Sequence, residues 1–167
     1  MINLTKWPKK SDVATLSISK LRADAVADVR TFNDELSIWS VNSDSESDIN
    51  EAFLALATGS KQERFDKMDV VIFTNEDLAS KGLTLQSATG DTAVVDLRDK
   101  HQNIVGLTYE TLTSVMSIIS EITYNSKQIR RTGSQIKQLI KDNYDRIDLD
   151  TFITDSIKVE IKKIAGK

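Results

Sequence analysis

The chain has 167 residues, a net charge of −3, 40% hydrophobic and 28% charged residues, which is typical of a globular protein with one domain or one domain and an appendage. It contains no cysteine, and this excludes disulfides, thiolate metal sites and cysteine nucleophiles. The N-terminus lacks the apolar core of a signal peptide, and the longest apolar runs are far shorter than the about 20 residues of a membrane span. We therefore expect a soluble, cytoplasmic protein without a membrane partner.

Up to residue 74 the sequence alternates between strand and helix patterns. Apolar and polar residues alternate with period two at 14–19 and 36–41, as in strands; at 36–41 apolar residues on both faces indicate that both faces are partly covered. The continuous apolar run within 68–74 is typical of a buried central strand. Apolar residues at helical spacing predict helices at 20–32 and 49–59.

Short polar segments connect these elements. Residues 33–35 predict a turn, because Asn and Asp side chains bond to nearby backbone groups. Asp48 is expected to cap the following helix, with Glu51 as its capping-box partner. A short helix is expected at 75–82, where Gly82 is a stop signal.

Three strand-like segments follow, separated by short polar turns. They occupy 83–88, 92–97 and 104–108, and connections of this length favour an antiparallel meander. The predicted fold class is α+β, with a mainly antiparallel sheet and flanking helices, followed by a C-terminal helical segment. We expect an acidic α+β body at 1–108 and a basic helical segment at 109–167, packed on the body or dimerising.

A heptad pattern marks residues 110–143, where no proline occurs and Gly133 is the one glycine. Apolar and small residues recur at a 4–3 spacing, which is typical of a helix that packs along one face. This candidate packing interface consists of Val115, Ile119, Ile122, Ile129, Gly133, Ile136 and Ile140.

Gly133 leaves two structures open. Glycine costs about 1 kcal/mol relative to alanine inside a helix. Either close packing compensates for this cost in a continuous helix, or the helix breaks at 132–134, with Asn125 and Ser134 as candidate caps. The apolar face then packs on the chain's own body or on a second copy, as a homodimer. A last helix is expected from an Asp150 cap to Gly166, with a stripe of isoleucines at Ile153, Ile157, Ile161 and Ile164.

Residues with catalytic or metal-binding chemistry are sparse. His101 is the single histidine and is expected to be a solvated turn residue. The acidic loop 44–48 lacks the glycine and the spacing of a calcium-binding EF-hand. Asp96 and Arg98 are expected to form an ordinary surface pair. We therefore predict no catalytic residue, no metal and no cofactor, and an enzyme is disfavoured.

Charge is distributed unevenly along the chain. Residues 1–124 carry 12 Lys and Arg against 19 Asp and Glu, whereas residues 125–167 carry 10 against 6. On a continuous helix, five cations would share one face free of acidic residues, a candidate contact for anions or nucleic acid. These residues are Lys127, Arg130, Arg131, Lys137 and Lys141. The alternative is that the basic segment neutralises the acidic body of its own chain.

Two functions fit these features. The first is a non-catalytic protein-binding factor of the inhibitor, immunity or regulatory type in a microbial cytoplasm, whose excess acid would steer a basic protein partner. The second is a nucleic-acid-binding regulator that uses the basic C-terminal helices as a homodimer.

Overall fold

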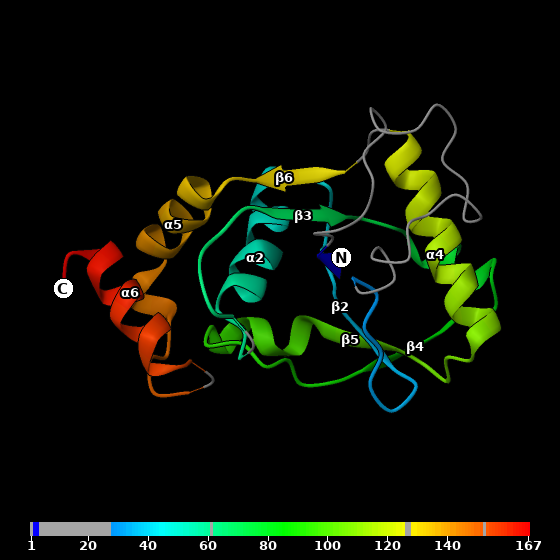
Figure 1. Cartoon of the computed structure of the whole chain (residues 1–167), viewed down its shortest axis with the longest axis horizontal. Helices are drawn as coiled ribbons and strands as arrows, with labels where there is room; N and C mark the ends of the chain where they lie inside the picture. The colour runs from blue at the N-terminus through cyan, green and yellow to red at the C-terminus, as the bar shows by residue number, and fades with distance from the viewer. Residues whose placement is uncertain (1, 4–27, 61, 126–127, 152) are drawn as a thin grey trace. The chain divides into compact units, whose positions relative to one another are not determined.

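The computed structural model describes residues 2–3, 28–60, 62–125, 128–151 and 153–167, and it has the predicted α+β fold with antiparallel sheets (Figure 1). The strands are β1 (Ile2–Asn3), β2 (Leu36–Trp39), β3 (Met68–Val71), β4 (Thr84–Ser87), β5 (His101–Val105) and β6 (Ile129–Arg131). They form two sheets, ordered β1-β3-β6 and β2-β5-β4. The α-helices are α2 (Glu46–Ala57), α3 (Asn75–Ala79), α4 (Tyr109–Tyr124), α5 (Gly133–Asp142) and α6 (Asp155–Ala165). The 3-10 helices are η3 (Val95–Lys100) and η4 (Tyr144–Arg146). Over these residues, none of the helices combines the length and the apolar character that crossing a membrane requires.

The chain forms two compact units, each assembled from three stretches of sequence. Unit 1 comprises Met1–Ile38, Asp69–Gln86 and Gln102–Arg130; unit 2 comprises Trp39–Met68, Ser87–His101 and Arg131–Lys167. The predicted helical segment contributes to both, since α4 belongs to unit 1 and α5 and α6 to unit 2. A division into domains at residue 108 stays a prediction.

Unit 1 is built around α4. The helix begins with a capping box between Thr108 and Thr111, and its apolar face is buried among residues of β2, β3, α3 and β5. Ile104 and Ile119 are completely buried in this cluster. The strand prediction for 68–74 is confirmed by β3, whose four residues are all buried.

The turn predicted at 33–35 is confirmed. Asn33 and Asp34 adopt positive φ angles of 52° and 59°, which Asn and Asp tolerate better than most residues. The flanking Phe32 and Glu35 exchange two backbone hydrogen bonds, so the chain reverses tightly into β2. The predicted helix 20–32 is wrong at its end, because no residue of 28–32 is in a helix. Residues 20–27, like the predicted strand 14–19, lie outside the described residues.

The middle strand of the predicted meander is wrong. Residues 92–94 form only isolated bridges, and η3 follows them from Val95. Ala93 donates to the Thr58 carbonyl and accepts from the Asp148 amide, so single contacts satisfy its backbone. Ala93 and Val94 are completely buried. The short apolar run thus indicates that these residues are buried, although they are not paired with a neighbouring strand in a sheet.

The heptad segment is broken, and the continuous-helix alternative is wrong. α4 ends at Tyr124 with Asn125 as its C-cap, and β6 separates it from α5. Thr132, and not the predicted Ser134, caps α5, in a capping box with Gln135. Gly133 is needed because a Cβ there would lie 2.8 Å from the carbonyl oxygen of Phe65.

Two other predicted helix starts are also displaced by hydroxyl caps. Ser45 caps α2 by accepting from the Asp48 amide, so Asp48 is the third residue of the helix and not its cap. Thr154 caps α6 in place of the predicted Asp150. In each case a hydroxyl three residues before the relevant amide satisfies an otherwise unpaired donor.

Unit 2 is a helical assembly. α5 packs against both α2 and α6, and α2 also contacts η3 (Figure 1). The isoleucines Ile136, Ile140, Ile157 and Ile161 are buried at these contacts. The isoleucine stripe predicted for the last helix is therefore a packing face.

Candidate functional site

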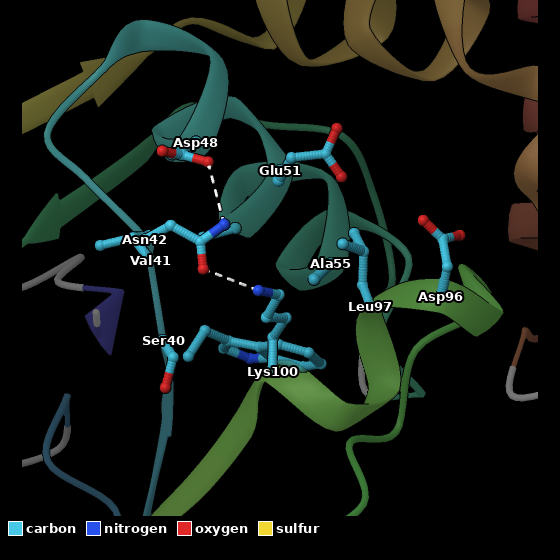
Figure 2. A pocket seen from close by; sticks show the side chains of 11 residues that line it. Ser40, Val41, Asn42, Asp48, Glu51, Ala55, Asp96, Leu97 and Lys100 are labelled. Carbon is cyan, nitrogen blue, oxygen red and sulfur yellow. Dashed lines mark hydrogen bonds between the residues drawn. The ribbon is translucent and has the colours of Figure 1, made fainter.

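Unit 2 contains a cavity of about 260 Å³ (Figure 2). Its wall comes from three places in the sequence: residues 39–42 at and after the end of β2, one face of α2, and η3. Ala52 and Ala55 lie on that face of α2, one helical turn apart, where their small side chains leave the space open.

The apolar floor of the cavity includes Trp39, whose position is tightly constrained. The His101 ring packs edge-on against the Trp39 ring with centroids 5.1 Å apart. A Cβ at Gly90 would lie 2.4 Å from the same indole, so only glycine fits there. His101 is half-buried, and burial lowers its pKa. The expectation of a solvated turn histidine is therefore wrong, because His101 is the first residue of β5 and the indole removes part of its water.

One side of the cavity carries a chain of polar contacts. The Lys100 ammonium donates to Asn42 Oδ1 over 2.7 Å, and Asn42 Nδ2 donates to Asp48 Oδ1 over 3.4 Å (Figure 2). Asp48 also accepts hydrogen bonds from the hydroxyls of Ser43 and Ser45. These contacts, the Ser43 hydrogen bond foremost, hold the pKa of Asp48 below its ordinary value.

Glu51 and Asp96, which also line the cavity, are joined by Arg146. The guanidinium donates to Glu51 Oε1 over 2.9 Å and to Oε2 over 2.7 Å, and its Nη2 donates to Asp96 Oδ2 over 2.5 Å. This pairing raises the pKa of Arg146 and lowers that of Asp96. The Glu51 and Asp96 side chains remain 37% and 60% exposed. In Figure 2 both lie on the side opposite Asn42.

The surface pair predicted between Asp96 and Arg98 is replaced by contacts with distant partners. Asp96 binds Arg146, whereas Arg98 Nη2 lies 3.8 Å from Asp148 and Arg98 Nε donates to the Thr92 carbonyl. Proximity in sequence was misleading, because the 3-10 geometry of η3 sends the two side chains to different neighbours.

The five basic candidates do not share a helix. Lys127 lies outside the described residues, and Arg130 and Arg131 are in β6. Arg130 binds Asp69 over 2.6 and 2.8 Å; Lys137, exposed on α5 like Lys141, binds Glu160 over 2.9 Å. The face predicted on a continuous helix is not formed, because β6 interrupts that helix.

Arg131 is held within unit 2. It donates to Asn50 over 2.9 Å and to Glu46 over 3.3 Å, and its guanidinium lies 5.3 Å from the centre of the Phe53 ring. Its side chain is therefore largely engaged with α2.

The candidate packing interface is likewise divided. Val115 and Ile119 are buried in the core of unit 1, and Ile122 packs at its edge. Ile129 is half-buried in β6. Gly133, Ile136 and Ile140 belong to α5 in unit 2. The heptad pattern therefore combines two separate apolar faces, one on α4 and one on α5.

The sequence did not indicate the cavity residues as a group. Glu51 and Arg146 are 95 positions apart, and no spacing relates them to Asp96. The nearest signal was Trp39 in a strand with both faces partly covered. Among the described residues, no three acidic, histidine or cysteine side chains are arranged to hold a metal ion.

The cavity combines an apolar floor with three carboxylates and the ammonium of Lys100. Such a wall favours a cationic group on an apolar stem, because the stem displaces water from the floor and the charge meets the carboxylates. The chain matches no family model, no curated protein and no solved structure.

Proposed function

We propose that this protein is a non-catalytic protein-binding factor of the inhibitor, immunity or regulatory type, acting in a microbial cytoplasm. The observation that supports this proposal is the cavity of unit 2, in which Asp48, Glu51 and Asp96 surround an apolar floor. Binding interfaces combine a buried apolar centre with a polar rim in this way.

The ionisation of the cavity carboxylates favours binding over catalysis. A general acid or base works best when its pKa lies near the working pH, which for a carboxyl group requires a raised value. The pKa of Asp48 and that of Asp96 are lowered instead, by Ser43 and Arg146 respectively. Both side chains therefore stay charged at neutral pH and attract cations.

The partner that fits is a basic protein. Residues 1–124 carry an excess of seven acidic residues, and a field of this sign accelerates association with a positively charged surface. Salt weakens the effect, because exposed charges farther apart than about 8 Å are screened at physiological ionic strength.

The test is capture of partners on the immobilised full chain at low salt, identification by mass spectrometry, and kinetics with the purified partner. Two matched variants reverse one exposed charge each: Asp44→Lys in the acidic part and Lys141→Glu in the basic part. With a basic partner, Asp44→Lys slows association and Lys141→Glu accelerates it. The proposal fails if no protein is retained, or if the retained protein associates at the same rate with both variants.

A nucleic-acid-binding regulator is the alternative, and the 10 cations against 6 acidic residues at 125–167 favour it. The same two variants then act in the opposite direction, since phosphates repel acidic residues and attract Lys141. Arg130 and Lys137 would have to exchange Asp69 and Glu160 for phosphates. Dimerisation through the heptad residues is disfavoured, because Ile119 and Ile136 are completely buried.

A further inference from the structure

The size of the unit 2 cavity suits a single amino-acid side chain. Its volume of about 260 Å³ lies just below the range of roughly 300–1,000 Å³ that small-molecule sites occupy. Interfaces place their most important side chains in pockets of this kind. The cavity is therefore sized for one anchoring residue of a partner.

Its floor suits a long stem. Trp39, Ala52, Ala55 and Leu97 are all buried apolar side chains that line the space. The Trp39 ring is held in place by His101 and by the close approach of Gly90, so it offers a rigid aromatic surface. Methylene groups bury well there, and a planar cation can also stack on an indole.

The rim selects a cation. Three carboxylates and one ammonium line the cavity, and Arg146 adds one further cation from outside, so one negative charge remains. A carboxylate offers about four acceptor sites, and Arg146 uses only part of those on Glu51 and Asp96. The exposed oxygens can accept a second donor.

The chain itself shows which cation these carboxylates bind well. Arg146 makes a two-bond contact with Glu51 and a third bond with Asp96. A guanidinium matches carboxylates in this fork geometry, whereas an ammonium acts as a point charge.

We propose that the unit 2 cavity receives an arginine side chain of the partner protein, with the stem on Trp39 and the guanidinium at Glu51 and Asp96. This inference rests on the proposed function and names the residue that the partner inserts. Lys100 stays turned to Asn42, where its hydrogen bond leaves the opposite rim to the incoming guanidinium.

The test uses Nα-acetyl-L-arginine amide as the probe, titrated into the full chain and followed by NMR. We expect saturable shifts of the Trp39 indole and of the Asn42 side-chain amide. The neutral isostere Nα-acetyl-L-citrulline amide should bind at least about fivefold more weakly, as expected for loss of one favourable ion pair. Nα-acetyl-L-lysine amide should fall between the two.

Three variants localise the site. Ala55→Leu fills the cavity and abolishes the shifts, and Glu51→Gln/Asp96→Asn weakens binding about tenfold. The control Asp44→Asn/Glu63→Gln removes the same charge from exposed residues that do not line the cavity, and binding should change less than about twofold. Urea unfolding of each variant shows whether unit 2 is intact.

Each outcome decides something. Three results would overturn the proposed arginine site: the citrulline probe binds as tightly as the arginine probe, the shifts do not saturate, or Ala55→Leu leaves binding unchanged while unit 2 is intact. If Ala55→Leu unfolds the chain, the double carboxylate variant against its control makes the same decision. If these variants still capture the partner, the protein-binding function is supported and the cavity is excluded as the site that receives an arginine. Probe binding at the cavity without any captured protein removes the protein-binding function instead.

Discussion

Each unit contains an arginine held by carboxylates, and the two arrangements differ in one respect. In unit 1, Arg130 donates twice to Asp69, whose side chain is only 7% exposed. In unit 2, Arg146 joins Glu51 and Asp96, whose side chains are 37% and 60% exposed beside a cavity. Arg130 makes two hydrogen bonds to its carboxylate and Arg146 makes three to its two carboxylates, so hydrogen-bond geometry alone does not distinguish the two arrangements.

Burial of the acceptor separates a structural ion pair from a candidate binding site. The buried Asp69 depends on its arginine, because few other donors and little water can reach it. The exposed oxygens of Glu51 and Asp96 are hydrated whenever Arg146 is absent and can accept another cation when it is present. The number of charged residues in the sequence does not indicate which carboxylates are buried and which are exposed.

The largest expected effect is on Arg130. Replacing it by alanine leaves a buried carboxylate without its cation, and we expect a loss of about 3 kcal/mol in the free energy of unfolding. Urea denaturation of Arg130→Ala measures it. A loss below about 1 kcal/mol would place this pair in the same class as an ordinary surface contact. Variants of Arg130 are therefore unsuitable as tests of nucleic-acid binding.

Gly133→Ala is expected to be the next most destabilising change, this time without a change of charge. The new methyl group would meet the Phe65 carbonyl oxygen at 2.8 Å, and overpacking of this kind costs about 1–3 kcal/mol. Ser134→Ala, one position along on the exposed side of α5, is the control and should change stability little. Stabilisation by Gly133→Ala would contradict the close approach seen here.

Arg146→Met should affect stability less than Arg130→Ala, by about 1 kcal/mol or less, because its carboxylate partners are exposed. It should also strengthen binding of Nα-acetyl-L-arginine amide, since the cavity rim becomes more negative. Lys158→Met, which removes the exposed pair with Asp150, is the control for loss of one cation. Binding that is weakened in Arg146→Met would show that Arg146 helps to form the site.

The smallest effect is expected from pH and is confined to unit 2. Burial lowers the pKa of His101 below its unfolded value of 6.5, so the unfolded chain binds this proton more readily. Stability is then fully present above pH 6.5 and falls as the pH drops through the folded pKa. Urea midpoints at pH 7.5 and 5.5 measure the loss, and His101→Phe should remove it.

Asp48 and Asp96 titrate in a separate and more acidic window. Their pKa values are lowered from 3.8, so their contributions are present above that pH and are lost only as the pH falls through the folded values. The Trp39 indole signal in NMR separates the two windows, since it lies against His101. A Trp39 shift that follows only the acidic window would contradict the assignment to His101.

Local features of the fold were predictable from the sequence because neighbouring residues determine them. Asn33 and Asp34 make a turn through their own backbone preferences, and Leu36 and Ile38 alternate along one buried face of a strand. The break before α5 is one of the two alternatives that the sequence allows, because Gly133 is a poor residue for a helix interior.

The failures share a different cause. The run at 92–97 has the composition of a strand, yet Thr58 and Asp148 satisfy the backbone of Ala93, so no neighbouring strand is required. The heptad spanning α4 and α5 is continuous in sequence but is divided between two cores. Periodicity indicates that a residue is buried, but it does not indicate which part of the molecule the residue packs against.

Composition and residues a few positions apart are sufficient to predict the α+β class, the strand at β3, the turn before β2, the isoleucine face of α6 and the acidic excess of residues 1–124. Which cations are neutralised, and where a cavity remains, depends on how distant segments pack together. Glu51, Asp96 and Arg146 come together from distant positions, and the accessibility of their oxygens depends on the packing of α2 and η3. Contacts between residues so far apart are selected by the whole fold, so no local pattern encodes them.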